Sequence, residues 1–246
     1  MLAGNLVAND YYLQGRRYQV LLPCQLNIAV DGPAGAGKST VSRAVARALG
    51  LSYLDTGSMY RALTWKALQA KVSPGDAGAL TALAEQTTWS FIGGGAASQL
   101  WMDGRPLPEA IRSDAVTELV SQVSSHQAVR RIMVAKQQEL CRAGGFIADG
   151  RDIGTVVMPN ADMKIYLTAS VEERAERRRL EQGKQVSALP DLIEGIRRRD
   201  HIDSNRKHSP LLQAEDALVL DTTAMPFERV VDCIVEKALS LCSGEA

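Results

Sequence analysis

The chain has 246 residues, 46% of them hydrophobic, and its 28 Lys and Arg side chains equal its 28 Asp and Glu side chains in number, so the formal net charge is zero. That length suits one large α/β domain with a smaller insertion, and a neutral chain lacks the basic field that attracts nucleic acid. The four cysteines are too far apart in sequence for a zinc site or a disulfide framework, and no apolar run is long enough to cross a membrane. We therefore expect a cytoplasmic protein without a nucleic-acid or membrane partner.

Residues 1–25 contain three tyrosines and two arginines. They lack the continuous apolar stretch of a signal peptide. We expect a poorly ordered N-terminal leader without chemistry of its own, followed by one domain over residues 26–246.

Short apolar runs alternate with helical stretches from residue 26 onward, which favours a parallel sheet with helices on both faces. Residues 170–173 have the Ser-x-x-Glu spacing of a capping box, so a helix should begin there. The last helix should follow Pro226, because apolar residues recur from Phe227 at intervals of three and four. The expected core strands are residues 26–30, 51–54, 145–149, 163–167 and 217–220, and the first helix is expected at 38–49.

The stretch 58–144 interrupts this alternation. An Asp-Gly step at 103–104 predicts a hairpin turn, so we expect a helical insert that carries a small antiparallel sheet. Its expected helices are 58–71, 76–86, 114–123 and 127–142, and its β-like pieces are 88–92, 99–102 and 105–111.

A glycine loop follows the first strand. The run from Gly32 to Ser39 reads Gly-Pro-Ala-Gly-Ala-Gly-Lys-Ser, which fits the phosphate-binding pattern G-x-x-x-x-G-K-[ST] in a strand–loop–helix setting. Glycines let successive amides face one anion, the lysine adds a positive charge, and the Ser39 hydroxyl can bind Mg²⁺. The sequence therefore predicts a site for the phosphates of ATP or GTP. Its expected residues are Gly32, Pro33, Ala34, Gly35, Ala36, Gly37, Lys38, Ser39 and Thr40.

Two further strand ends carry charged side chains. Asp55 and Arg61 follow the second strand, and Asp149, Arg151 and Asp152 follow the third. Because the carboxyl ends of parallel strands line one crevice, these residues should meet beside the loop, with Asp149 holding a Mg²⁺-bound water. A helix cap with a surface arginine, and a tight turn with a solvated ion pair, are the alternatives at the two positions.

Arginines are dense between residues 172 and 206, and acidic residues are interleaved with them. Most of these side chains suit a solvated helix pair with bridges between successive turns. Gly183-Lys-Gln185 lies between the two helical arms, as in a hinged lid whose arginines stabilise a transferring phosphoryl group. Spacing alone does not say which arginines do so.

Together these segments resemble the bacterial cytidylate kinases. The resemblance rests on 32–40, 54–61 and 121–123, on Asp149-Gly-Arg-Asp-Ile-Gly-Thr-Val156 and on Arg199-Asp-His-Ile-Asp-Ser-Asn-Arg206, in that order. It covers nearly all of the chain from Leu26. It implies a core at 26–57 and 145–246 of the P-loop NTPase type, a nucleoside-monophosphate-binding insert at about 58–144 and a helical lid at about 172–206.

The resemblance also implies roles for individual residues. Ser121, Arg130 and Asp152 would read the cytosine. Arg61, Arg151 and Arg206 would hold the phosphate of CMP, and Arg199 and Asp203 would contact the sugar, with Asp55 and Tyr60 lining the same pocket. Lys38, Arg151, Arg199 and Arg206 would be catalytic, and Ser39 and Asp149 would hold Mg²⁺, the latter through water.

We therefore expect a monomeric kinase that converts ATP and CMP or dCMP to ADP and CDP or dCDP, with ATP and Mg²⁺ as its cofactors. Another small-molecule P-loop kinase, such as a shikimate or adenylate kinase, is one alternative. A GTP-dependent switch is a second, although the chain has no Asn-Lys-x-Asp guanine-reading motif. A nucleic-acid remodeller is a third, which zero net charge disfavours.

Overall fold

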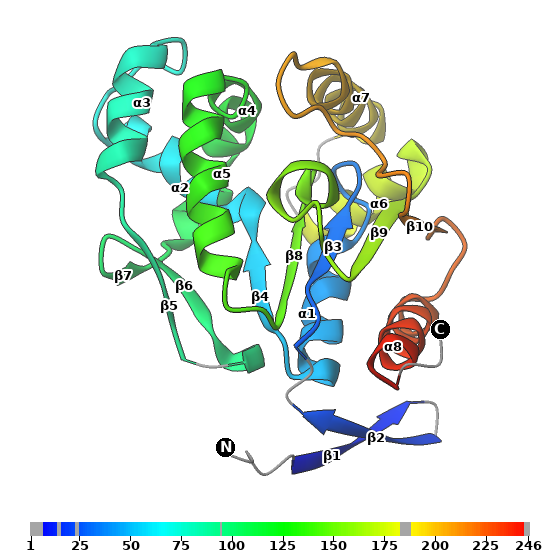
Figure 1. Ribbon diagram of the computed structural model, residues 1–246. Coiled ribbons are helices and arrows are strands. Elements are labelled where there is room, and N and C mark those ends of the chain that lie inside the picture. Colours follow the sequence, from blue (N-terminus) through cyan, green and yellow to red (C-terminus); the bar gives the residue numbers. More distant parts are fainter. Residues whose placement is uncertain (1–6, 14–15, 23–24, 94, 183–187, 244–246) are drawn as a thin grey trace.

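The computed structural model describes residues 7–13, 16–22, 25–93, 95–182 and 188–243. Its centre is a five-stranded sheet in the order β10-β9-β3-β8-β4, and every neighbouring pair of strands is parallel (Figure 1). The predicted parallel sheet is confirmed, and its strand ends differ from the expected ones by no more than about two residues. The strands are β3 (Ile28–Asp31), β4 (Ser52–Asp55), β8 (Phe146–Gly150), β9 (Met163–Thr168) and β10 (Leu218–Asp221).

Helices cover both faces of this sheet, as the alternation of apolar runs predicts. Successive side chains of a strand point to opposite faces, so Ile28 and Val30 pack in one apolar cluster and Ala29 packs in the other. The first face is covered by α1 (Lys38–Leu49) and α8 (Phe227–Ser243), and the second by α2 (Thr56–Gln69), α3 (Ala77–Gln86) and α5 (Gln127–Cys141). Each cluster contains side chains of both the strands and the helices. This packing holds in place the strand ends that surround the functional site.

The segment between α3 and α5 carries the small antiparallel sheet that the sequence predicts. It consists of β5 (Trp89–Ile92), β6 (Gln99–Met102) and β7 (Arg105–Pro106), with α4 (Asp114–Val123) after it. The expected strand over 105–111 is wrong beyond Pro106, because the chain turns into a short 3-10 helix, η2 (Glu109–Arg112). Prolines at 106 and 108 have no backbone N–H and cannot continue the ladder.

Two strands lie within residues 1–25. Strands β1 (Val7–Leu13) and β2 (Arg16–Leu22) pair antiparallel as a hairpin that lies beyond the sheet in the lower part of Figure 1. Their valines, tyrosines and leucines favour extended backbone, and the expectation of a poorly ordered leader stays a prediction.

The remaining elements bring charged residues toward the carboxyl ends of the sheet. A π-helix, η3 (Ile153–Val157), follows β8, and two helices that we call the lid helices, α6 (Val171–Gln182) and α7 (Leu189–Asn205), follow β9. The capping box is confirmed at its serine, since Ser170 Oγ accepts a hydrogen bond from the Glu173 amide at 3.2 Å. The expected hinge at Gly183–Gln185 lies outside the described residues. Within the described part of the chain, no helix is long and apolar enough to span a membrane.

Candidate active site

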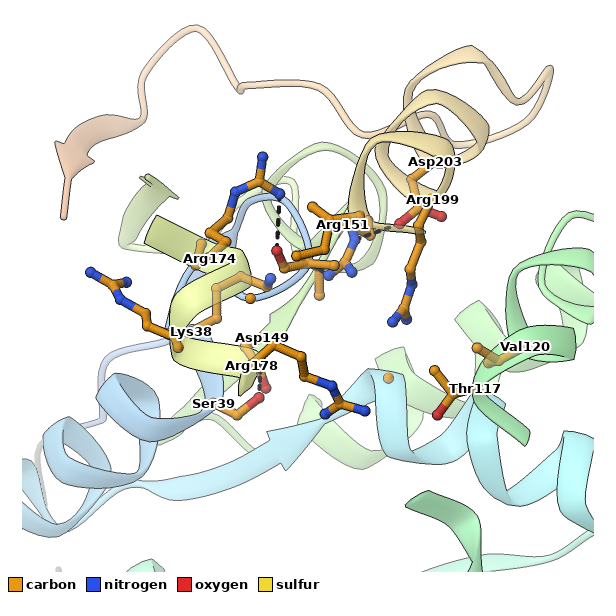
Figure 2. Close-up of a pocket in the computed structure, with 18 of the residues that line it drawn as sticks. Lys38, Ser39, Thr117, Val120, Asp149, Arg151, Arg174, Arg178, Arg199 and Asp203 are labelled. Atoms are coloured by element: carbon orange, nitrogen blue, oxygen red, sulfur yellow. Dashed lines mark hydrogen bonds and ion pairs between the residues drawn. The ribbon is translucent and has the colours of Figure 1, made fainter. Parts of the chain in front are cut away.

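A cavity of about 1080 Å³ opens at the carboxyl ends of β3, β4 and β8, between the lid helices and the helices that follow β4 (Figure 2). It brings together all of the site residues expected from the sequence except Gly32 and Pro33, which form the base of the glycine loop. The expected residues that line it are Ala34, Gly35, Ala36, Gly37, Lys38, Ser39, Thr40, Asp55, Tyr60, Arg61, Ser121, Arg130, Asp149, Arg151, Asp152, Arg199, Asp203 and Arg206.

The loop from Gly32 to Ser39 has a backbone that side chains would disturb. Gly32 has a φ of +148°, and a Cβ there would lie 1.9 Å from the Leu167 carbonyl oxygen. Gly37 has a φ of +83° at the N-cap of α1, and no side chain caps the amides of that helix end. The uncapped amides and the positive end of the α1 dipole therefore face the cavity, as an anion-binding loop requires.

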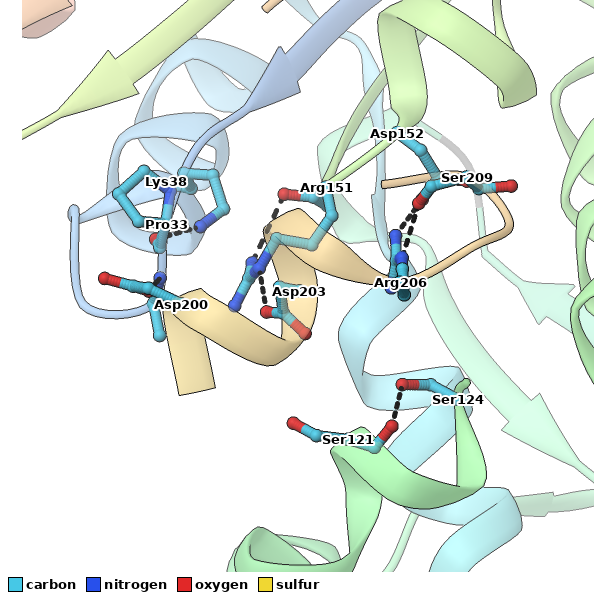
Figure 3. A network of polar contacts seen from close by, with 12 residues as sticks. Pro33, Lys38, Ser121, Ser124, Arg151, Asp152, Asp200, Asp203, Arg206 and Ser209 are labelled. Carbon is cyan, nitrogen blue, oxygen red and sulfur yellow. Dashed lines mark hydrogen bonds and ion pairs between the residues drawn. The ribbon is translucent and has the colours of Figure 1, made fainter. Parts of the chain in front are cut away.

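Lys38 lies inside this loop, where its Nζ donates a hydrogen bond of 2.7 Å to the Pro33 carbonyl (Figure 3). Burial and the nearby Arg151 guanidinium lower the pKa of Lys38 to about 7, although Asp149 and Asp31 oppose the change. Among the described residues, the hydrogen-bond partner of this lysine is thus a backbone carbonyl. A phosphate bound in the loop would supply a negative charge.

Asp149 sits next to the loop on β8. It accepts hydrogen bonds from the Ser39 hydroxyl at 2.8 Å and the Tyr53 hydroxyl at 2.7 Å. Burial and the neighbouring Asp55 raise the pKa of Asp149 to about 6. The Ser39 hydroxyl and the Asp149 carboxylate are the hard oxygen donors that Mg²⁺ prefers, and a cation here would relieve the buried negative charge. The residues present therefore fit a Mg²⁺ ion.

Three arginines line the cavity together, namely Arg61, Arg178 and Arg199. Arg178 and Arg199 point into the same space beside Thr117 (Figure 2). Burial, together with Arg151 and Arg61, lowers the pKa of Arg199 to about 10, and its Nε is buried without a hydrogen-bond partner. Burial and the adjacent Arg112 lower the pKa of Arg61 to about 10 as well. Buried like charges that depress one another's pKa create a site for an anion.

Asp152 also lines the cavity, and its carboxylate forms ion pairs with two arginines, of which Arg206 lies beside it in Figure 3. It accepts a hydrogen bond of 2.5 Å from Arg130 Nη2 and lies 3.4 Å from Arg206 Nη2. The Arg130 guanidinium lies 5.2 Å over the Tyr60 ring, and its Nε is buried without a partner. Ser121, on α4, completes this end of the cavity with a largely buried side chain.

Arg151 is held by Asp203 of α7, whose carboxylate accepts a hydrogen bond of 2.8 Å from its Nε. Burial would raise the pKa of Asp203, but Arg151 and Arg199 outweigh it and keep that pKa below its usual range. The pair joins the end of β8 to a lid helix. The Arg151 guanidinium therefore stays charged and oriented in the site.

The lid arginines have different surroundings, which the sequence does not reveal. Arg174 Nη1 donates to Asp200 at 2.6 Å and to the Ala34 carbonyl at 3.0 Å, so it braces the glycine loop. Arg177 donates to the Thr222 carbonyl at 2.6 Å. Arg178 lies 3.5 Å from Glu181 and points into the cavity.

The sequence analysis missed two side chains of this site. Tyr53 binds Asp149, and Thr117 Oγ1 accepts a hydrogen bond of 2.9 Å from Arg61 Nη1. Periodicity could have found both: Tyr53 is two residues before Asp55 on a strand, and Thr117 is one helical turn before Ser121.

A glycine loop at the start of a helix, a parallel sheet and a ring of buried arginines around one cavity define the class of P-loop phosphotransferases. The chain belongs to the cytidylate kinase family, whose sequence model matches residues 28–240.

Individual relatives agree with this placement. The chain is 48% identical over 213 residues to a cytidylate kinase of Geobacillus sp. (strain WCH70), and the match covers 86% of this chain and 95% of that protein. It is 46% identical over 235 residues to a bifunctional pantoate ligase/cytidylate kinase of Parasynechococcus marenigrum (strain WH8102), covering 93% of this chain but only 46% of that longer protein. A solved structure of an uncharacterized protein from Eubacterium ventriosum ATCC 27560 shares the fold, with a TM-score of 0.50 and 9% identity over 88% of this chain and 99% of that one.

Proposed function

We propose that this protein transfers the γ-phosphoryl group of ATP to CMP and to dCMP, giving ADP and CDP or dCDP. Family membership and the cavity support the proposal. The observation that carries it furthest is the buried Asp152–Arg130 pair, because these two side chains together present an acceptor and a donor to whatever enters that part of the cavity.

The pair suits the base of CMP. Cytosine has an amino group that can donate to the Asp152 carboxylate. Its ring nitrogen and carbonyl can accept from Arg130, whose buried Nε has no hydrogen-bond partner among the described residues. Uracil has an oxygen in place of the amino group, so two acceptors would face each other. That mismatch costs about 1–3 kcal/mol, or about 5- to 150-fold in kcat/KM.

The remaining arginines suit the phosphate and sugar of the same ligand. Arg61, Arg151 and Arg206 would hold the phosphate. Burial and Arg112 lower the pKa of Arg61, and a bound anion would raise it again. Arg199 and Asp203 would contact the sugar hydroxyls. Asp55 and Tyr60 line the same cavity.

In the transfer step, an oxygen of the CMP phosphate attacks the γ-phosphorus of ATP, and the bond from that phosphorus to the ADP oxygen breaks. Lys38 would neutralise charge on the β- and γ-phosphates, and Arg151, Arg199 and Arg206 would neutralise charge at the acceptor side. Closure of the lid helices would bring Arg178 to the same oxygens and exclude water, which would otherwise accept the phosphoryl group.

Ser39 and Asp149 are the residues that would hold Mg²⁺, Ser39 directly and Asp149 through water. When bound, the ion would supply positive charge that offsets the negative charge of the ATP phosphates. Tyr53 donates to Asp149 at 2.7 Å and keeps its carboxylate turned toward Ser39.

The proposal is tested by coupled ADP release with ATP-Mg²⁺ and each of CMP, dCMP, UMP, AMP, GMP and shikimate. We expect high turnover with CMP and dCMP and low turnover with UMP, since cytosine, unlike uracil, offers a donor to Asp152 and acceptors to Arg130. The protein carrying Lys38→Ala, assayed in parallel, measures any contaminating kinase. Turnover restricted to another acceptor would replace the proposed substrate, and turnover with none would refute the kinase assignment for this chain.

A matched pair of variants links the result to the pocket. Asp152→Asn keeps the shape of the side chain but replaces one acceptor oxygen with a donor, so the preference for CMP over UMP should narrow. Asp114→Asn makes the same change at an exposed carboxylate on the cavity rim and should leave the preference unchanged.

A further inference from the structure

The π-helix η3 begins directly after the segment that carries Asp152, and its first amides need acceptors. Asp152 is the N-cap residue of η3, a position where an aspartate side chain usually accepts from the second or third amide of the helix. Here it makes no such bond. Its carboxylate turns to Arg130 and Arg206 instead, while its backbone carbonyl accepts from the amides of Val156 and Val157 at 2.9 and 3.1 Å.

A carboxylate from a different strand takes the vacant place. Asp31, the last residue of β3, accepts from the Ile153 amide at 2.8 Å with one oxygen and from the Gly154 amide at 2.7 Å with the other. Its side chain is almost completely buried, with 3% exposed. The parallel register of β3 and β8 pairs Asp31 with Gly150, which brings it beside this turn.

Position 154 lies in van der Waals range of the Asp31 carboxylate. A Cβ on Gly154 would lie 3.1 Å from Lys164 Cδ and 3.4 Å from Asp31 Oδ2. Asp31 also immediately precedes Gly32, so one residue is joined by the chain to the glycine loop and by hydrogen bonds to the turn after Asp152.

We propose that Asp31 is a positioning residue that caps η3 in place of Asp152 and so leaves the Asp152 carboxylate available to the substrate in the cavity. The inference rests on the proposed function, because Asp152 is taken as the group that reads the base. If the Asp31 carboxylate were lost, the Gly154 amide would be without its acceptor and would compete with Arg130, Arg206 and the substrate for Asp152.

The test is Asp31→Asn, which keeps the size of the side chain and one acceptor oxygen but places an NH₂ group against the second amide. We expect the KM for CMP to rise about tenfold, the ratio of CMP to UMP turnover to narrow, and the KM for ATP to change little. Asp162→Asn is the matched control, because Asp162 also accepts from a backbone amide next to β3, that of Asn27 at 2.7 Å, but at the opposite end of the strand. It should change none of these constants.

A double-mutant cycle separates positioning from general damage. If Asp31 acts through Asp152, Asp31→Asn should have almost no further effect on the KM for CMP in an Asp152→Asn background. Effects that multiply in the double variant, or an unchanged KM in a folded Asp31→Asn protein, would overturn the proposal.

Amide hydrogen exchange followed by NMR on the unliganded wild-type protein tests the cap without any variant or substrate. The Ile153 and Gly154 amides should be protected, and rapid exchange of both would overturn the proposal even if Asp31→Asn does not fold. This measurement is independent of the substrate. A wild-type protein that phosphorylates a different acceptor would refute the proposed function while leaving the cap to be judged on exchange.

Discussion

At the scale of single residues, the site is defined by charges buried before any ligand is present. Lys38 is 6% exposed, and Arg199 Nε is buried without a partner. Burial and nearby cations lower the pKa values of both side chains. Holding cations in this state has an energetic cost, and a bound anion offsets it.

Lys38 gives the residue-scale prediction. With a pKa of about 7 it is largely neutral at about pH 8 in the free protein, and the phosphates of ATP should raise that pKa until it is charged. ATP binding at about pH 8 should therefore take up close to one proton. Titration calorimetry in buffers of different ionisation enthalpy measures the uptake, and Lys38→Met should abolish it. Binding enthalpies that do not depend on the buffer would show that Lys38 is already charged.

Residue-scale prediction from sequence worked where the signal is local. Lys38 and Ser39 belong to one continuous motif and lie where that motif predicts. Asp31 was missed because its partners, Ile153 and Gly154, are more than 120 positions away in sequence. A single sequence does not report such a pairing, which arises when parallel strands place their ends side by side.

At the scale of elements, the bounds of a helix or strand were predicted best where residues that end such elements stand at its ends. Helix α1 has the predicted bounds, because glycines with positive φ stand at both of its ends, Gly37 and Gly50. The expected strand over 105–111 stops at Pro106, because prolines at 106 and 108 interrupt the ladder. Helix α6 was predicted as an element, but the direction of each arginine depends on contacts with α7 and the glycine loop.

Those directions separate two roles on α6. Arg174 braces the Ala34 carbonyl and Asp200 and is 7% exposed, so Arg174→Met would leave these acceptors without their donor. We expect a loss of about 1–3 kcal/mol in the free energy of unfolding. Arg178→Met, by contrast, should lower kcat at least about tenfold with little change in unfolding, because Arg178 points into the cavity.

Thermal unfolding and steady-state kinetics of the two variants check this division. Arg179→Met is the control on the same helix, since Arg179 pairs with Glu176 through two hydrogen bonds on a half-exposed face. It should change neither quantity strongly. If Arg178→Met kept the full kcat, the proposed closure of Arg178 on the transferring group would be wrong.

At the scale of the whole molecule, a neutral chain concentrates unlike charges at one edge of its sheet. The sequence predicted this convergence, because three charged strand ends in one parallel sheet must meet. It did not predict that the pKa values of two carboxyl groups there, those of Asp31 and Asp149, would be raised. That property depends on burial by segments from the whole chain, and burial is the largest cause for both Asp31 and Asp149.

This charge arrangement predicts an unusual dependence of stability on pH. The pKa values of Asp31 and Asp149 are raised from 3.8 to about 6 in the folded protein. Between about pH 6.5 and 4.5 the native state therefore binds protons that the unfolded chain does not yet bind, so the free energy of unfolding should rise as the pH falls, by at most about 3 kcal/mol for each group. Turnover should fall over the same interval, because protonated Asp149 no longer attracts a cation beside Ser39.

Thermal unfolding of the unliganded protein in a pH series measures this change in stability. Asp149→Asn and Asp31→Asn, which cannot titrate, should each reduce the slope of stability against pH. A stability that falls steadily from about pH 6.5 to 4.5, with the same slope in both variants, would show that neither carboxylate is held in the unfavourable ionised state that the structure indicates.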